Sequence, residues 1–293
     1  MIAYLIIAHN EPEHFARLVD ALQGTASVVV AHIDLKSDIA PFVAATARDR
    51  ARFVEDRVSV NWAGWSQVEA SLRLLADARR AAPDSTHFAL LSGSHYPIAP
   101  DAEILARHAA MDGDAIESRP LPLDRGDPSS VRVRCRYVEG GFRNGRAARL
   151  AIGALNRALR LMPDRRIPAP FDRSGFRIGS QWWTLSRASA DHVLDFPTRS
   201  PAAHAFFRRA MTPDESYFQT VLATRGAPPA DGGATLTYTD WSDPREAPCH
   251  LAARHLALFE SPAFRAAPHR PLFARKFSRR NADLVAQIDR RLR

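Results

Sequence analysis

The sequence predicts an α/β protein in which a mixed sheet of the doubly wound, Rossmann type is flanked by helices. First, short and continuously apolar runs, typical of buried strands, alternate with stretches whose apolar residues recur at helical spacing. Second, this alternation favours parallel strands joined by crossover helices. Third, several apolar runs end in polar residues, at 9–10, 34 and 92–95. Because ligands of such sheets bind beyond the carboxyl ends of the strands, we expect a nucleotide site there.

The first hundred residues predict six elements. In order these are strand, helix, strand, strand, helix and strand, over residues 3–10, 11–22, 27–34, 58–65, 66–82 and 86–98. The first helix is expected to bury one face, since its apolar residues recur at helical spacing, at Phe15, Leu18, Val19 and Leu22. Ser66 is predicted to cap the second helix, with Glu69 completing a capping box. The last strand breaks at Ser92 and Gly93.

The composition changes over residues 124–171, which are rich in arginine, glycine and proline and contain one helical stretch near 146–161. We interpret this segment as an insertion or lid over the site. Beyond it the patterns predict a strand followed by a helix, then a helix, a strand and a basic amphipathic helix, over residues 175–196, 212–226, 234–241 and 281–293. No repeat or linker interrupts the chain, so residues 1–293 are expected to form one domain.

The charge of the chain indicates an anionic partner. Lysine and arginine number 40 against 32 aspartate and glutamate residues, which gives a formal net charge of +8. The arginines are scattered, and no long basic run is interleaved with aromatic residues, which argues against nucleic acid as the partner. The basic helix at 281–293 leaves peripheral contact with an anionic membrane surface, or with an acidic polysaccharide, as an alternative.

The cysteines and the first residues bear on location. Cys135 and Cys249 have neither the spacing of a metal site nor that of a disulfide framework, which fits a reducing compartment. The apolar run at residues 3–8 is too short to span a bilayer, and no basic segment precedes it. We therefore expect a cytoplasmic protein.

Motifs that bind phosphate or metal are missing from the expected places. No G-x-G-x-x-G follows the first strand and no Walker sequence occurs, which disfavours a dinucleotide dehydrogenase or a P-loop enzyme. The single Asp-x-Asp, Asp112 and Asp114, contains an Asp-Gly of ordinary turn chemistry, and no cluster has zinc spacing. If the protein binds a diphosphate, arginine or lysine would have to neutralise it in place of a metal.

Glu215 has two interpretations. The stretch "TPDESYFQTVLATRG" predicts a helix with Thr212 as N-cap, Pro213 at the first helical position and Glu215 at the third. On one interpretation the carboxylate belongs to a capping box or is stabilised by the helix dipole. On the other it is a general base, because a helix start projects a carboxylate into a cleft.

The tryptophans also have two interpretations, as core residues or as residues that bind a sugar. Periodicity alone predicts core positions for Trp182, Trp183 and Trp241. Tryptophans also stack on sugar faces, and Trp241 lies between Asp240 and Ser242. Trp182 and Trp241 are therefore kept as candidate substrate-binding residues.

Eight stretches carry a resemblance to a known family. In order they are "AYLIIAHNEPEHFARLVDAL", "HIDLKSD", "VNWAGWSQVEASL", "LLSGSHYPI", "GSQWWTLSR", "TPDESYFQTVL", "YTDW" and "LFARKF". Together they resemble the core-2/I-branching β-1,6-N-acetylglucosaminyltransferase family, which also includes peptide xylosyltransferases. The resemblance runs from residue 3 to residue 277, nearly the whole chain.

The resemblance implies a fold and a reaction. The fold would be GT-A-like without the Asp-x-Asp motif, with residues 1–123 as the nucleotide-binding half and 172–293 as the acceptor and catalytic half. The reaction would be inverting and metal-independent, from a UDP-sugar to an acceptor hydroxyl of a glycan, without a cofactor. N-acetylglucosamine is the first expected sugar and xylose the second. Glu215, in the "PDE" motif, would be the general base.

The resemblance also implies the donor contacts. Only two basic residues of the chain are lysines, Lys36 and Lys276, and both fall in the matching stretches. By resemblance, Lys276 of "FARKF" contacts the diphosphate, Asp34 of "HIDLKS" the uracil, and Trp62 lies near the uridine. The end of the first strand should border the same base, at Ile7 and Ala8.

Three departures leave roles open. His95 stands where the family usually has aspartate, within "SGSHYP". An arginine upstream is expected on the diphosphate, and spacing does not choose among Arg245, Arg254 and Arg275. Trp241 resembles an aromatic residue on the acceptor side.

Two alternatives to this function remain. One is a non-catalytic carbohydrate- or anion-binding protein on the same fold, and the other is a metal-dependent transferase that uses Asp112 and Asp114. Animal members of the family are Golgi-anchored and rich in disulfides, and we expect neither trait in this chain. The resemblance therefore implies a bacterial cytoplasmic relative, with peripheral attachment to the inner membrane as an alternative.

Overall fold

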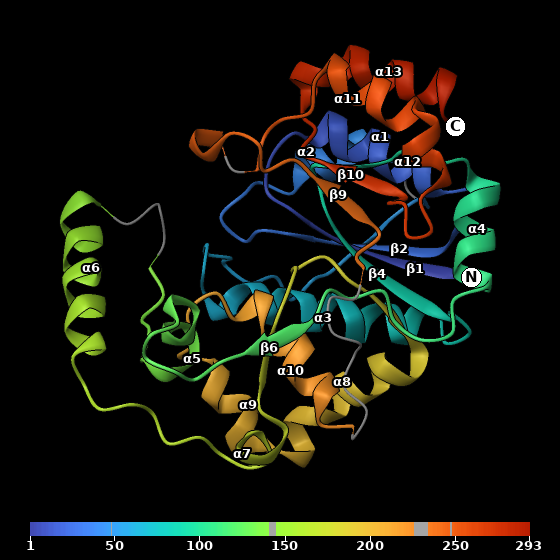
Figure 1. Cartoon of the computed structure of the whole chain (residues 1–293). Helices are drawn as coiled ribbons and strands as arrows, with labels where there is room; N and C mark the ends of the chain where they lie inside the picture. The colour runs from blue at the N-terminus through green and yellow to red at the C-terminus, as the bar shows by residue number, and fades with distance from the viewer. Residues whose placement is uncertain (48, 141–144, 226–233, 247) are drawn as a thin grey trace.

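A five-stranded sheet lies at the centre of the computed structural model, which describes residues 1–47, 49–140, 145–225, 234–246 and 248–293. The strand order is β3–β2–β1–β4–β8, and Figure 1 labels β1, β2 and β4 of this sheet. The first four of these strands in the chain run parallel, and β8 is antiparallel to β4. The strands are Ile2–Ala8 (β1), Ala26–Ile33 (β2), Arg52–Phe53 (β3), His87–Ser92 (β4) and Thr184–Ser186 (β8).

Helices cover both faces of this sheet because the side chains of β1 alternate between two hydrophobic clusters. Tyr4 and Ile6 belong to one cluster, and Ala3 and Leu5 to the other. The first cluster is completed by Pro12–Leu22 (α1), Ala253–Glu260 (α11) and Ala282–Arg291 (α13). The second is completed by Trp65–Ala81 (α3), Arg187–Arg199 (α8), Pro201–Phe207 (α9) and Tyr217–Ala223 (α10). The predicted α/β fold, a mixed sheet flanked by helices, is confirmed.

A second sheet brings the end of the chain to the carboxyl edge of the first. Its order is β5–β10–β9, with β10 antiparallel to β5 and parallel to β9. These strands span His95–Pro97 (β5), Thr237–Thr239 (β9) and Phe273–Arg275 (β10). The chain leaves the central sheet at the predicted break after Ser92, and Arg275 then pairs with His95 in the second sheet.

The remaining elements are short, except for two helices. The long ones are α4 and α6, which span Asp101–Ala109 and Arg146–Arg160. The others are Ala40–Ala45 (α2), Val131–Arg134 (α5), Phe171–Ser174 (α7), Pro262–Ala266 (α12) and the antiparallel pair Arg119–Leu121 (β6) and Phe176–Ile178 (β7). The helix expected near 146–161 is confirmed as α6. In the described part of the chain, no helix is long and apolar enough to cross a membrane.

The strand predicted over residues 58–65 is wrong. The strand that pairs with β2 at this edge of the central sheet is instead β3. It has two residues, and its partners are Val30 and Ala31 of β2. Residues 58–61 form irregular backbone that is held by side chains instead, and His32 Nε2 accepts from the backbone N–H of Val58 at 2.9 Å. The apolar residues that predicted a strand here therefore lie in a loop.

The capping box predicted at Ser66 is also wrong. The N-cap of α3 is Gly64, which has no side chain that could accept a capping hydrogen bond. Glu139 takes that role from a distant part of the chain, because its carboxylate accepts from the backbone N–H of Ser66 at 3.1 Å and from Asn61 Nδ2 at 2.8 Å. A carboxylate at a helix N-terminus accepts hydrogen bonds from free N–H groups and interacts favourably with the positive end of the helix dipole.

The helix predicted from Thr212 begins later than expected. Pro213–Glu215 form a 3₁₀ turn, and α10 starts only at Tyr217. Thr212 has a left-handed backbone, with φ of 46°, and its hydroxyl donates to the carbonyl of Met211 rather than capping the helix. The capping-box interpretation of Glu215 is therefore wrong, which leaves its carboxylate available for other contacts.

The predicted pattern over residues 175–196 is realised as β7, β8 and α8, two short strands in different sheets followed by the helix. Neither the boundaries of the two halves, 1–123 and 172–293, nor the lid role of 124–171 is decided by these elements. Both stay predictions.

Candidate functional site

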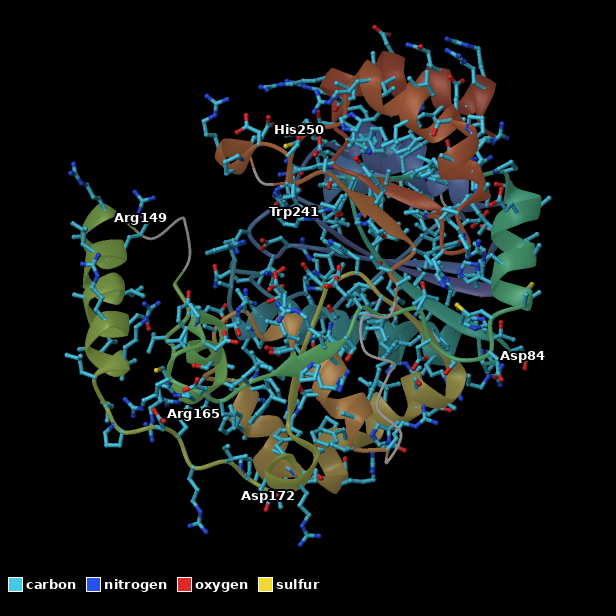
Figure 2. The ribbon with its side chains drawn as sticks, in the orientation of Figure 1. Asp84, Arg149, Arg165, Asp172, Trp241 and His250 are labelled. Atoms are coloured by element: carbon cyan, nitrogen blue, oxygen red, sulfur yellow. The ribbon has the colours of Figure 1, made fainter. Side chains whose placement is uncertain are left out.

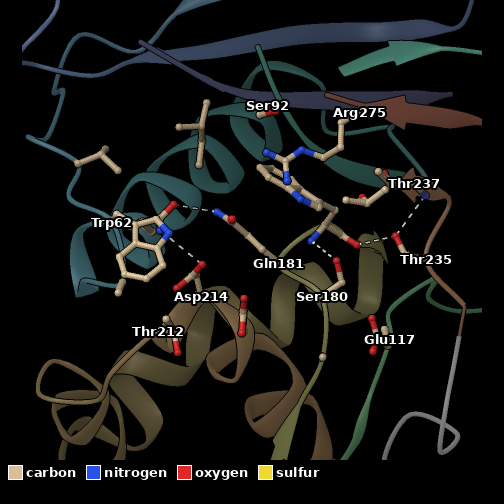
Figure 3. A pocket seen from close by; sticks show the side chains of 18 of the residues that line it. Trp62, Ser92, Glu117, Ser180, Gln181, Thr212, Asp214, Thr235, Thr237 and Arg275 are labelled. Carbon is tan, nitrogen blue, oxygen red and sulfur yellow. Dashed lines mark hydrogen bonds between the residues drawn. The ribbon is translucent and has the colours of Figure 1, made fainter. Parts of the chain in front are cut away.

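The carboxyl ends of the parallel strands open into a cavity of about 930 Å³ (Figure 3). Its size is typical of small-molecule sites, which measure about 300–1,000 Å³. The polar residues at the strand ends lie at its wall, at His9 after β1, Asp34 after β2 and Ser92 at the end of β4. The cavity is therefore where the topology of the sheet predicts a ligand.

Most of the candidate residues from the sequence meet in this cavity. Those at its wall are Ile7, Ala8, Asp34, Trp62, Trp182, Glu215, Trp241 and Arg275. Those outside the wall are His95, Arg245, Arg254 and Lys276.

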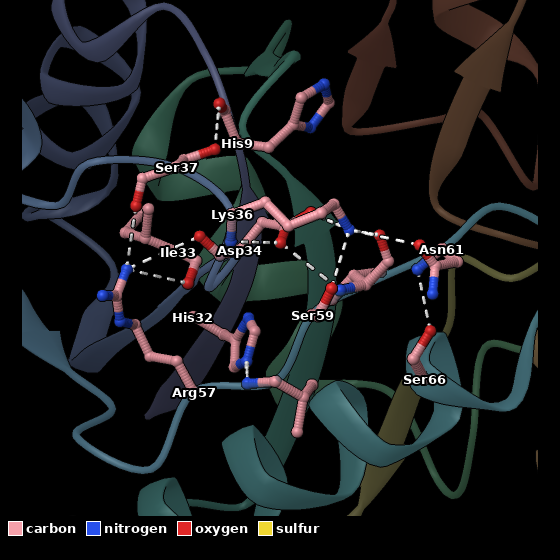
Figure 4. A network of polar contacts seen from close by, with 12 residues as sticks. His9, His32, Ile33, Asp34, Lys36, Ser37, Arg57, Ser59, Asn61 and Ser66 are labelled. Atoms are coloured by element: carbon pink, nitrogen blue, oxygen red, sulfur yellow. Dashed lines mark hydrogen bonds and ion pairs between the residues drawn. The ribbon is translucent and has the colours of Figure 1, made fainter. Parts of the chain in front are cut away.

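Asp34 and Lys36 link the turn after β2 to the loop that contains Ser59 and Val60, at one end of the cavity (Figure 4). Asp34 Oδ1 accepts from the backbone N–H groups of Lys36 at 2.9 Å and of Val60 at 3.3 Å, while Oδ2 pairs with the Lys36 ammonium at 3.0 Å. That ammonium also donates to the carbonyl of Val60 and to Ser59 Oγ. Lys36 thus fixes the loop that carries Trp62.

Two tryptophans present large exposed rings to the cavity. Trp62 is 67% exposed and Trp241 is 63% exposed, and both lie at the wall. The interpretation of Trp241 as a core residue is therefore wrong. Exposed aromatic rings beside a cavity offer stacking surfaces for a base or a sugar. Trp183, in contrast, is buried with its ring centroid 4.8 Å from that of Phe218, as expected of a core residue.

Arg275 supplies a largely buried positive charge to the cavity wall. Its guanidinium lies over the ring of Trp182, 4.7 Å from the ring centroid, and burial lowers the pKa of Arg275 to about 10. Within the described residues no carboxylate pairs with it, and its Nε has no hydrogen-bond partner. A buried cation without a counterion costs free energy, so the arrangement favours an anionic ligand.

His95 lies behind Trp182 and is fully buried. The centroids of the two rings are 4.7 Å apart, and His95 Nδ1 accepts from the backbone N–H of Ser92 at 2.8 Å. Burial, and then the charge of Arg275, lower the pKa of His95 well below its ordinary value, so this ring is neutral at pH 7. His95 therefore supports Trp182 and does not reach the cavity wall itself.

The structure distinguishes the three arginines that the sequence left open. Arg245 is exposed and pairs with Asp243 at 2.9 Å. Arg254 pairs with Asp240 at 3.0 Å, and Asp240 also bonds to His255 at 2.9 Å. Only Arg275 of the three lies at the cavity wall.

Lys276 follows Arg275 and is partly buried. Burial first, and then the charge of Arg275, lower the pKa of its ammonium. Its backbone carbonyl accepts from the N–H of Leu251 at 3.0 Å, which holds β10 against the segment before α11. The ammonium has no ion pair among the described residues, so it is available to an anion at the edge of the site.

Glu215 is joined to Arg132 by an ion pair in which Arg132 Nη1 donates to Glu215 Oε2. Both side chains lie at the cavity wall. In the part of the chain that the structure describes, the other oxygen of Glu215, Oε1, has no hydrogen bond. One oxygen is therefore held while the other is free to accept a proton.

Asp214, beside Glu215, ends a chain of amide contacts. Gln181 Nε2 donates to Gln67 Oε1 at 3.1 Å, and Gln67 Nε2 donates to Asp214 Oδ2 at 3.5 Å (Figure 3). Burial, and then the negative charge of Glu215, raise the pKa of Asp214 to about 7. The fold therefore disfavours the charged form of Asp214.

Asp112 and Asp114 lie outside the cavity wall. Asp114 Oδ1 accepts from the backbone N–H of Ser186 at 2.7 Å, and Oδ2 accepts from Ser189 Oγ at 2.6 Å. The carboxylate therefore stabilises the start of α8, and no group of metal-ligating residues occurs among the described residues. The structure gives no support to the alternative in which these two aspartates hold a metal for catalysis.

The model of the Core-2/I-Branching enzyme family matches residues 2–260, most of the chain. The chain belongs to the Core-2/I-Branching enzyme family. The cavity described above is thus the candidate site of a member of this family.

Among its relatives is a human protein named β-1,3-galactosyl-O-glycosyl-glycoprotein β-1,6-N-acetylglucosaminyltransferase 3, which is 24% identical over 237 residues, 78% of this chain and 48% of the relative. A protein of the same name without the number, from bovine herpesvirus 4 (strain V. test), is 24% identical over 226 residues, 75% of this chain and 46% of the relative. The chain spans about half the length of the curated relatives it matches. A solved mannose-1-phosphate geranyltransferase from Thermus thermophilus is 16% identical, with a TM-score of 0.29 over 79% of this chain and 70% of that chain, a likeness too slight to bear on fold or function.

Several residues at the wall were not singled out from the sequence. They are Glu117, Arg119 and Arg132 from the middle of the chain, and Gln67, Gln181 and Asp214. Arg132 stands in an arginine-rich segment where spacing does not distinguish it from its neighbours. Asp214 is the one residue of this group for which the sequence contained a signal. It adjoins Glu215 in "PDE", and a pair of neighbouring carboxyl groups is a recognisable feature of functional sites.

Proposed function

We propose that the protein is a glycosyltransferase that moves a sugar from a UDP-sugar to an acceptor hydroxyl of a glycan. Membership of the Core-2/I-Branching enzyme family supports this, as do relatives whose names specify β-1,6-N-acetylglucosamine transfer. N-acetylglucosamine is the first donor sugar to test and xylose the second. The observation that carries the proposal is one cavity that holds both the Glu215 carboxylate and the Arg275 guanidinium.

The nucleotide would occupy the end of the cavity bordered by Ile7, Ala8, Asp34 and Trp62, beyond the carboxyl ends of β1 and β2. Trp62 offers an exposed ring to stack on the base, while Ile7 and Ala8 supply an apolar border. Asp34 has its oxygens occupied by Lys36 and Val60, so it contributes mainly by shaping this wall.

Glu215 is the proposed general base. Its Oε1 accepts the proton of the acceptor hydroxyl while the hydroxyl oxygen attacks the anomeric carbon. The bond from that carbon to the phosphate oxygen breaks, and UDP leaves with the bonding electron pair. Attack from the side opposite to the leaving group inverts the configuration of the anomeric carbon.

Arg275 and Lys276 are the proposed partners of the diphosphate. A fixed positive charge in a buried site stabilises the charge that develops on the departing UDP. Arg275 provides such a charge at the cavity wall without a carboxylate partner among the described residues, and Lys276 follows it in the chain. The proposal therefore assigns to these two side chains the role that a divalent metal has in other transferases.

The acceptor would lie near Trp241, on the β9 side of the cavity. Its exposed ring is suited to stacking on a sugar face. The proposed location of the reaction is the cytoplasm, because both cysteines, Cys135 and Cys249, are free and buried.

The test is release of UDP from a panel of UDP-sugars with and without glycan acceptors. Glu215→Gln should lower transfer by about 10²–10⁴-fold, as is typical of the loss of a general base. UDP affinity should stay unchanged, because Glu215 is not placed on the nucleotide. Glu13→Gln, an exposed position on α1 outside the cavity, is the matched control and should leave transfer unchanged.

Two outcomes would overturn parts of this proposal. Full transfer in Glu215→Gln would remove Glu215 as the base, and transfer that disappears with EDTA and returns with manganese would remove the metal-independent mechanism. Binding of UDP-sugars with no turnover, for any sugar and acceptor tested, would identify a non-catalytic binding protein instead.

A further inference from the structure

Most residues of helix α6 are exposed. None of its 15 residues is buried, and it stands apart from the helices that cover the central sheet (Figure 1). Its attachment to the rest of the protein includes Asn156, whose Oδ1 accepts from the backbone N–H of Val138 at 2.8 Å and whose Nδ2 donates to the carbonyl of Val138 at 3.0 Å. Isolated helices of this length are marginally stable in water, so an additional contact is expected to stabilise α6.

The sequence of α6 divides its surface into three faces. With 100° between successive residues, the partly buried side chains Ile152, Asn156 and Leu159 form a narrow face toward the protein. An adjacent face carries all four arginines, Arg146, Arg149, Arg157 and Arg160. Figure 2 labels Arg149 on this helix. The third and widest face contains only apolar residues, and every one of them is exposed: Ala147, Leu150, Ala151, Ala154, Leu155 and Ala158.

The apolar face continues past the end of the helix. Leu161 is 89% exposed and Met162 is 46% exposed, so exposed apolar side chains extend beyond Arg160. Exposed and contiguous apolar residues on one face of a helix are costly in water and indicate an interaction surface.

The charge of this region has one sign. From residue 140 to residue 163 the sequence contains no aspartate or glutamate. Arginine stems lie along an apolar boundary while their guanidinium groups reach anionic groups above it. An apolar face bordered by arginines is therefore complementary to the interface of a bilayer that contains anionic lipids.

We propose that α6 docks on an anionic membrane surface, with its alanine and leucine face in the interface and its arginines against lipid phosphates. Nucleic acid and acidic polysaccharide match the arginines but provide no apolar phase for Leu150 and Leu155. A second copy of the chain matches the apolar face but brings four arginines against four arginines. The bilayer surface alone matches both faces.

The sequence left membrane contact of the C-terminal helix as an alternative, and α6 is the better candidate for such a contact. In α13 the apolar residues Leu284, Val285 and Ile288 are buried in the first hydrophobic cluster, so this helix has no apolar face left for a membrane. The inference concerns a surface outside the cavity and does not depend on the reaction catalysed there.

The test is co-sedimentation of the full chain with vesicles of phosphatidylcholine alone and with about 30% phosphatidylglycerol. We expect binding to the anionic vesicles that weakens with added salt. Arg149→Gln should weaken binding roughly fivefold, since each basic residue near such a surface contributes about 1 kcal/mol. Arg290→Gln, at an exposed position of α13, is the matched control and should bind as the unmodified protein does.

Leu150→Asp with Leu155→Asp tests the apolar face and should reduce binding by more than tenfold. Both positions are exposed, so the melting temperature and UDP binding should be unchanged, which separates this result from unfolding. Equal binding to both vesicle types, or no binding to either, would overturn the proposal. A dimer in light scattering that this double variant abolishes, without vesicle binding, would show a second copy as the partner of α6.

Discussion

Arg132 and Glu215, 83 residues apart in the chain, form an ion pair at the wall of the cavity. The pair joins α5, within the segment 124–171, to the 3₁₀ turn that carries the proposed base. A planar guanidinium holds one carboxylate oxygen in a defined direction. The orientation of Glu215 is therefore set by the segment that the sequence predicted as an insertion or lid.

Arg132→Ala should lower kcat by roughly 10–100-fold, because misplacement of a catalytic group by about 1 Å has effects of this size. The affinity for UDP should change by less than about twofold if Arg132 acts on Glu215 alone. Steady-state kinetics and calorimetry with UDP measure the two quantities.

Arg132→Lys should recover part of the activity, because an ammonium keeps the charge without the fork geometry. The matched control is Arg125→Ala, which removes an exposed arginine of the same segment that lies outside the cavity. Equal loss of kcat in the control would reduce the role of Arg132 to folding of the segment.

Arg275→Met should have opposite effects on stability and binding. Removal of a largely buried cation without a carboxylate partner among the described residues should raise the melting temperature of the ligand-free protein. It should also weaken UDP binding by about 10–100-fold, the size of effect for hydrogen bonds to charged groups. Thermal shift with and without UDP measures both, and a lower melting temperature with unchanged UDP affinity would make Arg275 a structural residue. Arg245→Met, at an exposed ion pair, should change neither.

Lys276→Arg should impair transfer even though the charge is kept. An ammonium is a compact point charge, while a guanidinium is larger and donates in a fixed plane. We expect a several-fold rise in the Kd for UDP and a larger loss after Lys276→Ala. Unchanged kcat/KM in the arginine variant would show that any cation suffices at this position.

Asp214→Asn should change how stability depends on pH. The pKa of Asp214 is raised from 3.8 to about 7, so the folded protein holds this proton more tightly than the unfolded chain does. The stability that protonated Asp214 contributes is present below pH 3.8 and is lost as the pH rises toward about 7. Asparagine keeps the shape and an acceptor for Gln67 without this loss.

The variant should therefore match the unmodified protein at pH 4 and be more stable at pH 8. The upper limit of the difference is roughly 4 kcal/mol, since one pKa unit is worth about 1.36 kcal/mol. Chemical denaturation at the two pH values checks it. A difference of the same size at both pH values would contradict the assignment to Asp214.

The sequence was sufficient for elements that are determined locally. The apolar run of β1 and the helical spacing of Phe15, Leu18, Val19 and Leu22 predicted the first strand and helix, and all four side chains are fully buried. Burial of one face is written into the order of residues, because the periods of strand and helix are fixed by backbone geometry. The ends of the parallel strands then located the cavity.

Local patterns failed where a distant residue supplied the partner. Ser66 had the spacing of a capping box, yet Glu139, 73 residues away, satisfies the start of α3. Thr212 and Glu215 had the same spacing, yet Arg132 takes the Glu215 carboxylate. A cap and an ion pair of similar free energy compete for one side chain, and only the three-dimensional arrangement decides between them.

By itself, the sequence determined the α/β fold, the location of a cavity at the strand ends, and the motifs that mark the Core-2/I-Branching enzyme family. Only the tertiary structure selected Arg275 over Arg245 and Arg254, placed His95 behind Trp182, and left α6 with an exposed apolar face. These outcomes depend on which charges are already paired and which faces are already covered. Pairing and burial are properties of contacts between distant segments, so no local pattern of residues encodes them.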